Sequence, residues 1–233
     1  MYIAALTKTT LLDYPEHVAA TVFTGGCNFR CPWCHNGEFT GRTDEDPIPE
    51  EEVLGFLKKR AGILEGVCIT GGEPTLQRDL PEFTEKVRAL GYLVKLDTNG
   101  TDPEMLSDLI NRGLVDYVAM DLKNTWEKYA ETAGLVPDGA EPLIRRVKES
   151  VRILLEGKIP YEFRTTVVKG FHTREDLHQM AALIEGAPRY FIQSYRDSEN
   201  VLCRERCSAF TAEELKEMIS GINGAEVSLR GVD

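Results

Sequence analysis

The chain has 233 residues, of which 42% are hydrophobic and 28% charged, so it is long enough to bury a full core. Its net charge of −11 argues against a general nucleic-acid binder, which carries an excess of basic residues. No apolar run predicts a membrane-spanning helix, and residues 1–17 lack the basic and apolar regions of a signal peptide. We therefore expect a cytoplasmic protein that binds neither nucleic acid nor a membrane, and whose cysteines stay reduced.

Short β-branched runs alternate with amphipathic segments along the chain. The predicted strands cover 17–24, 66–70, 92–98, 115–122, 161–168 and 190–194. Helices are expected to begin near Pro49, Leu80, Pro103, Pro142, Thr173 and Thr211. This alternation is typical of a parallel sheet with helices outside it.

Local signals support several of these helices. Pro103 follows an acidic N-cap residue, and Thr211 stands three residues before Glu214, as in a capping box. Three glycines are predicted to end the helices that precede the third, fourth and fifth strands, namely Gly91, Gly113 and Gly157.

Six βα units are fewer than the eight of a closed barrel, so we predict an α/β fold with a partial (βα)6 barrel. A single domain is expected to span residues 1–233. Residues 1–16 form a lead-in with a short strand, 17–194 the barrel core, and 195–233 a C-terminal segment with a helix. An additional edge strand is predicted within that last segment, at 225–230.

Three of the six cysteines, Cys27, Cys31 and Cys34, follow the first barrel strand with the spacing CxxxCxxC. Thiolates suit iron–sulfur clusters or zinc, but a structural zinc ion takes four ligands. His35 is poorly placed to turn toward the same ion as Cys34. Three thiolates on one loop can hold three irons of a cubane and leave the fourth iron open to a small molecule. Zinc with a distant fourth cysteine is the alternative.

This spacing, with Trp33 just before the last cysteine, resembles the signature of the radical S-adenosylmethionine (SAM) enzymes. The resemblance implies a [4Fe–4S] cluster on Cys27, Cys31 and Cys34, with SAM chelated to the open iron. It also implies that Trp33 packs near the adenine of SAM.

After the second strand, the segment TGGEPT at 70–75 resembles the GGE segment of the same enzymes. By itself a glycine pair indicates only a turn. The resemblance implies that the backbone of Gly71 and Gly72 binds the methionine ammonium of SAM. It also implies that Glu73 adds favourable charge or holds the loop.

Polar segments follow the third and fourth strands as well, LDTNG at 96–100 and MDLK at 120–123. Capping and turn formation would explain these residue types. Both segments also resemble those of the glycyl radical enzyme activases. For this chain, the resemblance implies that Asp97, Thr98 and Asp121 hold a monovalent cation. It also implies that Asn99 and Lys123 line the SAM site.

The fifth predicted strand carries one charged residue, Arg164, inside an apolar run. Alternation places it on one face with Glu162, Thr166 and Val168. It either extends outward or pairs with Glu162, or it points into the barrel and meets the carboxylate or ribose of SAM, as the family implies. Gln193, at the end of the sixth strand, can reach the same pocket.

The lead-in and the sequence GCNFRCPWCHN resemble the glycyl radical enzyme activases, most of all the activating proteins of anaerobic ribonucleoside-triphosphate reductase. The expected partners are therefore a glycyl radical enzyme as protein substrate and a flavodoxin- or ferredoxin-type electron donor. No catalytic side chain is expected beyond the cluster and its cofactor. The alternatives are a radical SAM enzyme acting on a small molecule or peptide, and a non-catalytic iron–sulfur or zinc scaffold.

Three cysteines remain outside the motif. Cys68 lies in an apolar strand and is expected to be a buried core thiol. Cys203 and Cys207 follow the sixth strand, where they are either surface or semi-buried thiols, or a redox pair or labile metal site near the open rim.

Overall fold

The computed structural model describes residues 1–41 and 46–231, so the last two residues of the predicted domain lie outside the described part. Its framework is a single eight-stranded sheet in the order β1 to β8. The strands are β1 (Ile3–Thr10), β2 (Ala19–Thr24), β3 (Gly66–Gly71), β4 (Leu93–Thr98), β5 (Tyr117–Asp121), β6 (Tyr161–Val167), β7 (Tyr190–Ser194) and β8 (Val227–Arg230). Only β1 is antiparallel to its neighbour, and each strand from β2 to β8 is parallel to the next.

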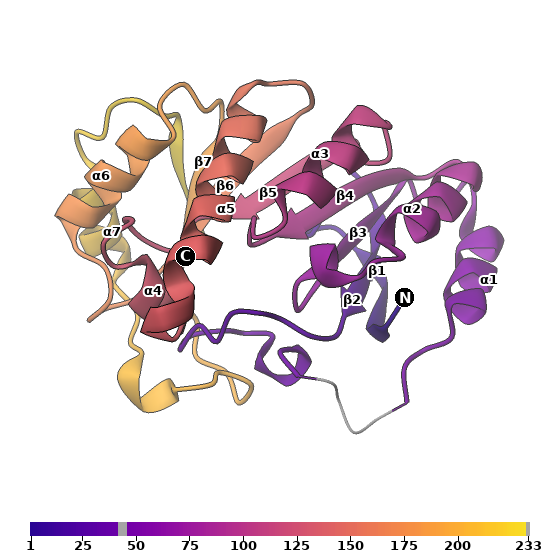
Figure 1. Cartoon of the computed structure of the whole chain (residues 1–233), viewed down its shortest axis with the longest axis horizontal. Helices are drawn as coiled ribbons and strands as arrows, with labels where there is room; N and C mark the ends of the chain where they lie inside the picture. Colours follow the sequence, from indigo (N-terminus) through magenta and orange to yellow (C-terminus); the bar gives the residue numbers. More distant parts are fainter. Residues whose placement is uncertain (42–45, 232–233) are drawn as a thin grey trace.

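The helices cover the outside of this curved sheet, from α1 at one end to α6 and α7 at the other (Figure 1). They are α1 (Glu50–Arg60), α2 (Leu80–Ala89), α3 (Pro103–Asn111), α4 (Tyr129–Thr132), α5 (Pro137–Leu155), α6 (Arg174–Leu183) and α7 (Ala212–Ile219). Three short 3-10 turns complete the described elements, η1 (Gly37–Phe39), η2 (Pro74–Leu76) and η3 (Arg204–Arg206).

The predicted partial barrel is confirmed. Among the described residues no ladder joins β1 to β8, so the sheet curves without closing. The lead-in strand is β1, and the predicted edge strand is β8, which is two residues shorter at its start than 225–230. The six predicted βα units correspond to β2 through β7.

Most helix starts agree with the sequence signals. Asp102 caps α3 by accepting from the amide of Met105, and Thr211 and Glu214 form the predicted capping box. One prediction was wrong, because α5 begins at Pro137 and contains Pro142 in its interior. Pro142 lacks an amide hydrogen, but so early in the helix this removes only one backbone bond. The short helix α4 was not predicted.

The apolar core lies between the helices and the outer face of the sheet. Its fully buried members include Phe83, Leu96 and Phe163. The inner face of the sheet is more polar and carries Lys95 from β4, which is only 2% exposed. Charged side chains in this interior need partners, because an unpaired buried charge is costly. The partners found there define the candidate site.

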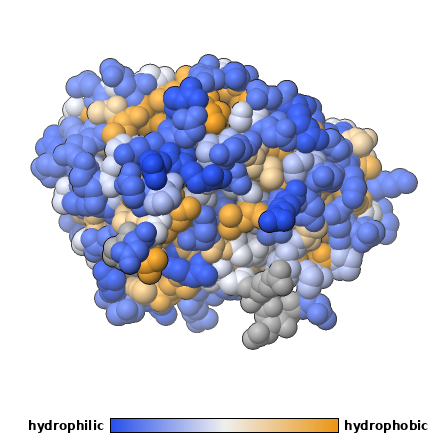
Figure 2. Space-filling model, in the orientation of Figure 1, coloured by the Kyte–Doolittle hydropathy of each residue, from blue (hydrophilic) through white to orange (hydrophobic). Residues whose placement is uncertain are grey.

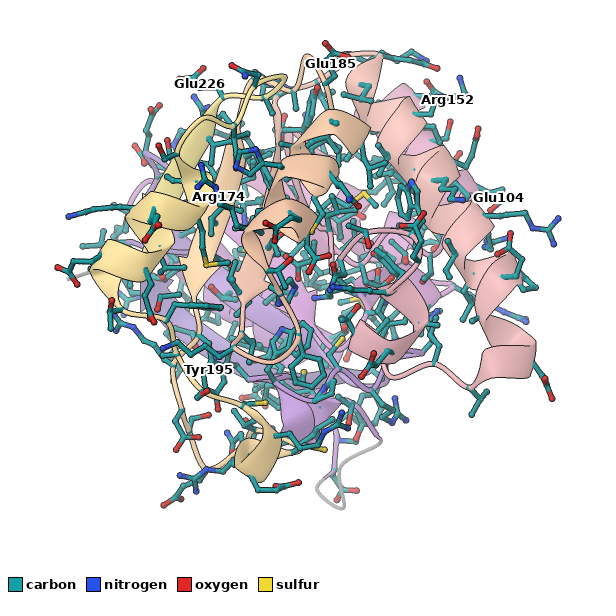
Figure 3. The ribbon with its side chains drawn as sticks, turned by 90° about the vertical axis from the view of Figure 1, so that its left-hand side faces the viewer. Glu104, Arg152, Arg174, Glu185, Tyr195 and Glu226 are labelled. Atoms are coloured by element: carbon teal, nitrogen blue, oxygen red, sulfur yellow. The ribbon has the colours of Figure 1, made fainter. Side chains whose placement is uncertain are left out.

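The outer surface is mainly hydrophilic, with scattered hydrophobic residues on the face that Figure 2 shows. Charged side chains such as Glu104 on α3 and Arg152 on α5 extend from the outer edge of the molecule in Figure 3. Within the described residues, none of the helices combines the length and apolar character needed to cross a lipid bilayer.

Candidate functional site

A cavity of about 400 Å³ opens where the parallel strands end. The carboxyl ends of such strands meet at one rim of a barrel, and this is where barrel enzymes place their sites. Every site residue predicted from the sequence lines this one cavity: Cys27, Cys31, Trp33, Cys34, Gly71, Gly72, Glu73, Asp97, Thr98, Asn99, Asp121, Lys123 and Arg164. The structure thus brings together the ends of four strands, β3 to β6, and the cysteine loop that follows β2.

The cysteine loop follows β2 and is held from two sides. The amide of Arg30 donates to the carbonyl of Ala133 beside α4, and the amide of Cys203 donates to the carbonyl of Pro32. Figure 1 shows the loop running along one side of the molecule between these two segments. A loop fixed at both flanks can hold its cysteines in position without a hydrophobic core of its own.

The three thiols lie close enough to influence one another. Burial, with the nearby charge of Glu73, raises the pKa of Cys27 to about 11, and burial raises that of Cys31 to about 12. Cys27 and Cys34 add to the rise at Cys31, while the Lys123 ammonium opposes it. Among residues 1–41 and 46–231, no three His, Cys, Asp or Glu side chains are arranged to hold a single metal ion. A cubane instead takes one thiolate on each iron, so its ligands need not converge on one point.

The glycine pair after β3 sits directly against the cysteine loop. Gly71 has a φ of +111°, and a Cβ on Gly72 would lie 2.2 Å from the carbonyl oxygen of Gly26. The amides of Gly72 and Glu73 donate to the carbonyls of Thr24 and Gly26, both at 2.8 Å. Glycine is therefore required here for backbone contact between two loops as well as for an open cavity wall.

Glu73 is 1% exposed and accepts hydrogen bonds with both carboxylate oxygens. Its Oε1 accepts from the Thr75 amide at 3.1 Å, the Thr75 hydroxyl at 2.6 Å and the Thr98 hydroxyl at 2.7 Å. Its Oε2 accepts from the Asn99 amide at 2.6 Å. Burial raises the pKa of Glu73, although these donors oppose the rise. Of the two roles expected for Glu73, the contacts support holding the loop.

A row of alternating charges crosses the part of the cavity wall that β4, β5 and β6 form. Lys95 pairs with Asp97, and Arg164 reaches Asp97 at 3.1 Å and Asp121 at 2.9 Å. Lys123 completes the row at 3.1 Å from Asp121. Burial alone would raise the pKa of both carboxylates, but Arg164 and the two lysines outweigh it. The pKa of Asp97 is lowered, and that of Asp121 falls to about 2.

Arg164 therefore points into the barrel. Its predicted alternative partner, Glu162, is fully buried and instead accepts from Arg230 at 2.8 and 3.0 Å and from the Tyr117 hydroxyl at 2.8 Å. The strand register explains why Arg164 pairs with Asp121 and not with Glu162, because Asp121 of β5 lies beside Arg164 of β6.

Trp33 forms an aromatic wall at the side of the cavity. It is 3% exposed and lies 5.0 Å from Phe171 and 5.3 Å from His172, measured between ring centroids. The Val168 amide donates to Nδ1 of His172 at 3.2 Å, so the ring proton must be on Nε2, which donates to the Lys123 carbonyl at 2.8 Å. His172, which the sequence did not single out, thus connects Trp33 to the segment that carries Asp121 and Lys123.

Several other lining residues were not predicted. Asp13 comes from the connection between β1 and β2 and accepts from the Thr21 hydroxyl at 2.5 Å. Asn36, directly after the cysteine motif, donates to the Gly71 carbonyl at 3.0 Å. Alternation along β2 could have assigned Thr21 and Phe23 to the inner face, whereas no sequence signal located Asp13. Gln193 lines the cavity, as predicted.

The remaining cysteines lie in two places. Cys68 is fully buried on β3, and the Lys95 ammonium lies 3.8 Å from its sulfur. Cys203 and Cys207 are partly buried on either side of η3. Cys207 packs against the group that contains Trp33 and Tyr195, the latter labelled in Figure 3. The segment after β7 thus lies against the cysteine loop.

Replacing His172 should change how stability depends on pH. Burial lowers the pKa of His172 below 6.5, so below that pH the unfolded chain takes up a proton that the folded protein resists. The free energy of unfolding should therefore fall as the pH drops from 6.5 toward the folded pKa. His172→Gln should cost about 1–3 kcal/mol at pH 7.5, and less at pH 5.5, in urea unfolding.

The matched control is His17→Gln, at an exposed pair with Glu65, because it leaves the contacts of His172 intact. It should keep the wild-type loss of stability at low pH. A cost of His172→Gln that is equal at the two pH values would contradict the lowered pKa of His172.

Comparison with known proteins connects this geometry to a family. The model of the radical SAM superfamily matches residues 21–184. Over 200 residues, the chain is 32% identical to a protein of Methanocaldococcus jannaschii provisionally named a glycyl-radical enzyme activating enzyme, covering 84% of this chain and 81% of that protein. It is also 31% identical over 188 residues to a 7-carboxy-7-deazaguanine synthase of Thermococcus kodakarensis, covering 72% and 70% of the two chains.

Among solved structures, Streptococcus suis SuiB bound to S-adenosylmethionine superposes with a TM-score of 0.67 at 15% identity. The match covers 88% of this chain but only 48% of SuiB, so this chain corresponds to about half of that protein. At this identity the likeness shows the fold alone. The family match, however, spans well over half of the sequence and includes the cysteine loop and the segments after β3, β4 and β5. The chain therefore belongs to the radical SAM superfamily.

Proposed function

We propose that this chain is an activase that cleaves SAM reductively and takes a hydrogen atom from a glycine of a partner glycyl radical enzyme. Anaerobic ribonucleoside-triphosphate reductase is the partner that the lead-in and the cysteine motif favour. The observation that supports this proposal most strongly is that three thiols of one loop share a cavity with the Gly71–Gly72 backbone. The charged side chains Asp97, Asp121, Lys123 and Arg164 line the same cavity. The relative named as an activating enzyme, which matches along most of both chains, supports the same activity.

The residues present fit the [4Fe–4S] cluster that the family implies. Cys27, Cys31 and Cys34 line the same cavity, and the Lys123 ammonium lowers the pKa of each thiol, against the effect of burial. A positive charge beside a ligand set favours the thiolate form that binds metal. The described lining of the cavity contains no cysteine besides these three, so a bound cluster would have one iron left for SAM.

The cavity also offers complementary groups for SAM. Gly71 and Gly72 would present backbone to the methionine ammonium, Trp33 would pack near the adenine, and Arg164 would meet the carboxylate or ribose. Thr98, Asn99, Asp121 and Lys123 line the same wall. When bound, the cluster supplies the electron that splits SAM into methionine and a 5′-deoxyadenosyl radical. The protein's own contribution is to orient SAM and the substrate and to exclude water.

The open edge of the sheet supports a protein as substrate. β1 and β8 stay unpaired with each other in the described structure, which leaves a side where a glycine-bearing loop can enter. The electron would come from a flavodoxin- or ferredoxin-type protein. Positioning decides which hydrogen is removed, so the partner's glycine must reach van der Waals contact with the radical carbon.

Replacing the motif cysteines should abolish cluster assembly. In anaerobically reconstituted protein, alanine at Cys27, Cys31 or Cys34 should reduce iron and sulfide content and the visible absorption to near the background. The double variant of Cys203 and Cys207 is the matched control and should keep the cluster, because these thiols lie outside the cavity wall. Full cluster retention in the three single variants would refute this ligand set.

A monovalent cation held by Asp97, Thr98 and Asp121 remains a prediction of the resemblance. Lys95, Lys123 and Arg164 already neutralise the two carboxylates, so such a cation has to compete with three protein charges. If it binds, potassium at constant ionic strength should raise the affinity for SAM, and Asp121→Ala should remove that dependence. Affinity that is indifferent to potassium in the wild type would show that the ion pairs suffice.

The substrate itself is tested by electron paramagnetic resonance. Reduced protein, SAM and the anaerobic ribonucleotide reductase of the same genome should together produce the doublet of a glycyl radical. Omitting SAM, or replacing the reductase glycine by alanine, should remove the doublet.

The second candidate is a radical SAM enzyme acting on a small molecule, which the similarity to a 7-carboxy-7-deazaguanine synthase supports. No doublet with any glycyl radical enzyme of the genome, together with small-molecule stimulation of 5′-deoxyadenosine formation, would establish that candidate instead.

A further inference from the structure

We propose that the side chain of Asn99 donates an N–H···S hydrogen bond to Cys27 and thereby raises the reduction potential of the cluster. This inference rests on the proposed cluster site at Cys27, Cys31 and Cys34. It assigns Asn99 a role as a positioning residue for the metal centre, in addition to the SAM-lining role that the resemblance implied.

The contact is specific in its geometry. Nδ2 of Asn99 lies 3.8 Å from Sγ of Cys27, although the two residues are 72 positions apart in the sequence. The backbone amide of Phe29 provides a second donor to the same sulfur at 3.4 Å. Sulfur accepts over longer distances than oxygen does, so both contacts are of hydrogen-bond length.

The orientation of the Asn99 amide is fixed by its neighbours. Its Oδ1 accepts from the Thr101 backbone amide at 3.0 Å, and a backbone N–H can only donate. The oxygen must therefore face Thr101, and the NH₂ group must face Cys27. The Thr101 hydroxyl also donates to this oxygen, at 2.7 Å.

A third residue closes a ring of hydrogen bonds. Nδ2 of Asn99 donates one hydrogen to Oδ1 of Asn28 at 2.9 Å, and Nδ2 of Asn28 donates to the Thr101 hydroxyl at 2.8 Å. The second hydrogen of Asn99 is then left for the Cys27 sulfur. Asn99 and Thr101 are 6% and 3% exposed, so water competes little for these groups. Fully satisfied buried networks of this kind are rigid.

The negative charge near Cys27 explains why a hydrogen-bond donor to its sulfur would affect the cluster. The Glu73 carboxylate is 1% exposed and accepts from the Asn99 backbone amide at 2.6 Å, so its negative charge lies beside the segment that contacts Cys27 and disfavours further negative charge there. A reduced cluster carries one more electron than an oxidised one, so its thiolates are more negative and gain more from a donated hydrogen bond. Hydrogen bonds to the ligating sulfurs are a known determinant of cluster potential. Asn99 would therefore offset Glu73 and make the one-electron reduction easier.

The test is a redox titration of the reconstituted protein without SAM, followed by electron paramagnetic resonance. Asn99→Ala removes the donor but keeps the backbone bond to Glu73. It should shift the reduction equilibrium about tenfold toward the oxidised cluster, roughly 59 mV for a one-electron couple. Thr101→Val removes the hydroxyl from the ring while keeping the Asn99 side chain, and should lower the potential by a smaller amount. Asn111→Ala is the matched asparagine control, because Asn111 is exposed at the end of α3 and donates to the Ser107 hydroxyl outside the cavity, and it should keep the wild-type potential.

Iron and sulfide content separates the outcomes. A wild type that assembles no cluster on the three cysteines would overturn the proposed function. Intact clusters with the wild-type potential in Asn99→Ala would overturn this inference alone. If Asn99→Ala cannot hold its cluster, Asn99→Asp decides in its place, because it keeps the oxygen that accepts from the Thr101 amide but has no N–H to donate to Cys27. An unchanged potential in Asn99→Asp would likewise overturn the inference.

Discussion

The site depends on one buried carboxylate. Glu73 is almost fully excluded from solvent, and its oxygens accept from the segment after β3 and from the end of β4. An ionised carboxylate can be buried only when such donors replace its hydration. The hydrogen bonds to the Glu73 carboxylate therefore fix the distance between the ends of β3 and β4. It also places the backbone of Asn99, and with it the Asn99 side chain, beside Cys27.

Charge is distributed unequally around the cavity. Glu73 meets only neutral donors, whereas Asp97 and Asp121 are each paired with two cations across the row from Lys95 to Lys123. The first arrangement keeps negative charge close to the cysteine loop. The second keeps two carboxylates ionised without a net repulsion of an anionic ligand group. Both arrangements are made by the protein's own side chains and backbone.

The cysteine loop obtains its rigidity from segments far away in the sequence. The carbonyl of Arg30 lies so close to Gly134 that a Cβ there would approach it to 2.1 Å, and the segment after β7 covers the other flank through Cys203. The cysteine loop is therefore held between α4 on one side and the segment that follows β7 on the other. The C-terminal segment is thus part of the site's support and not merely an extension of the barrel, since β8 also supplies Arg230 to the buried Glu162.

The sequence by itself determined the features that depend on local spacing. The alternation of strands and helices, the CxxxCxxC loop and the polar residues after successive strands were enough to predict the barrel and to gather the site at one rim. The tertiary structure decided the partners: Arg164 with Asp121 and not Glu162, His172 with Trp33, Asn99 with Cys27, and Asp13 in the cavity wall. It also showed that α5 begins at Pro137, whereas the sequence had predicted a start near Pro142. The physical reason is that strand register and loop packing set these pairs, and both are fixed by which faces of distant segments are buried together.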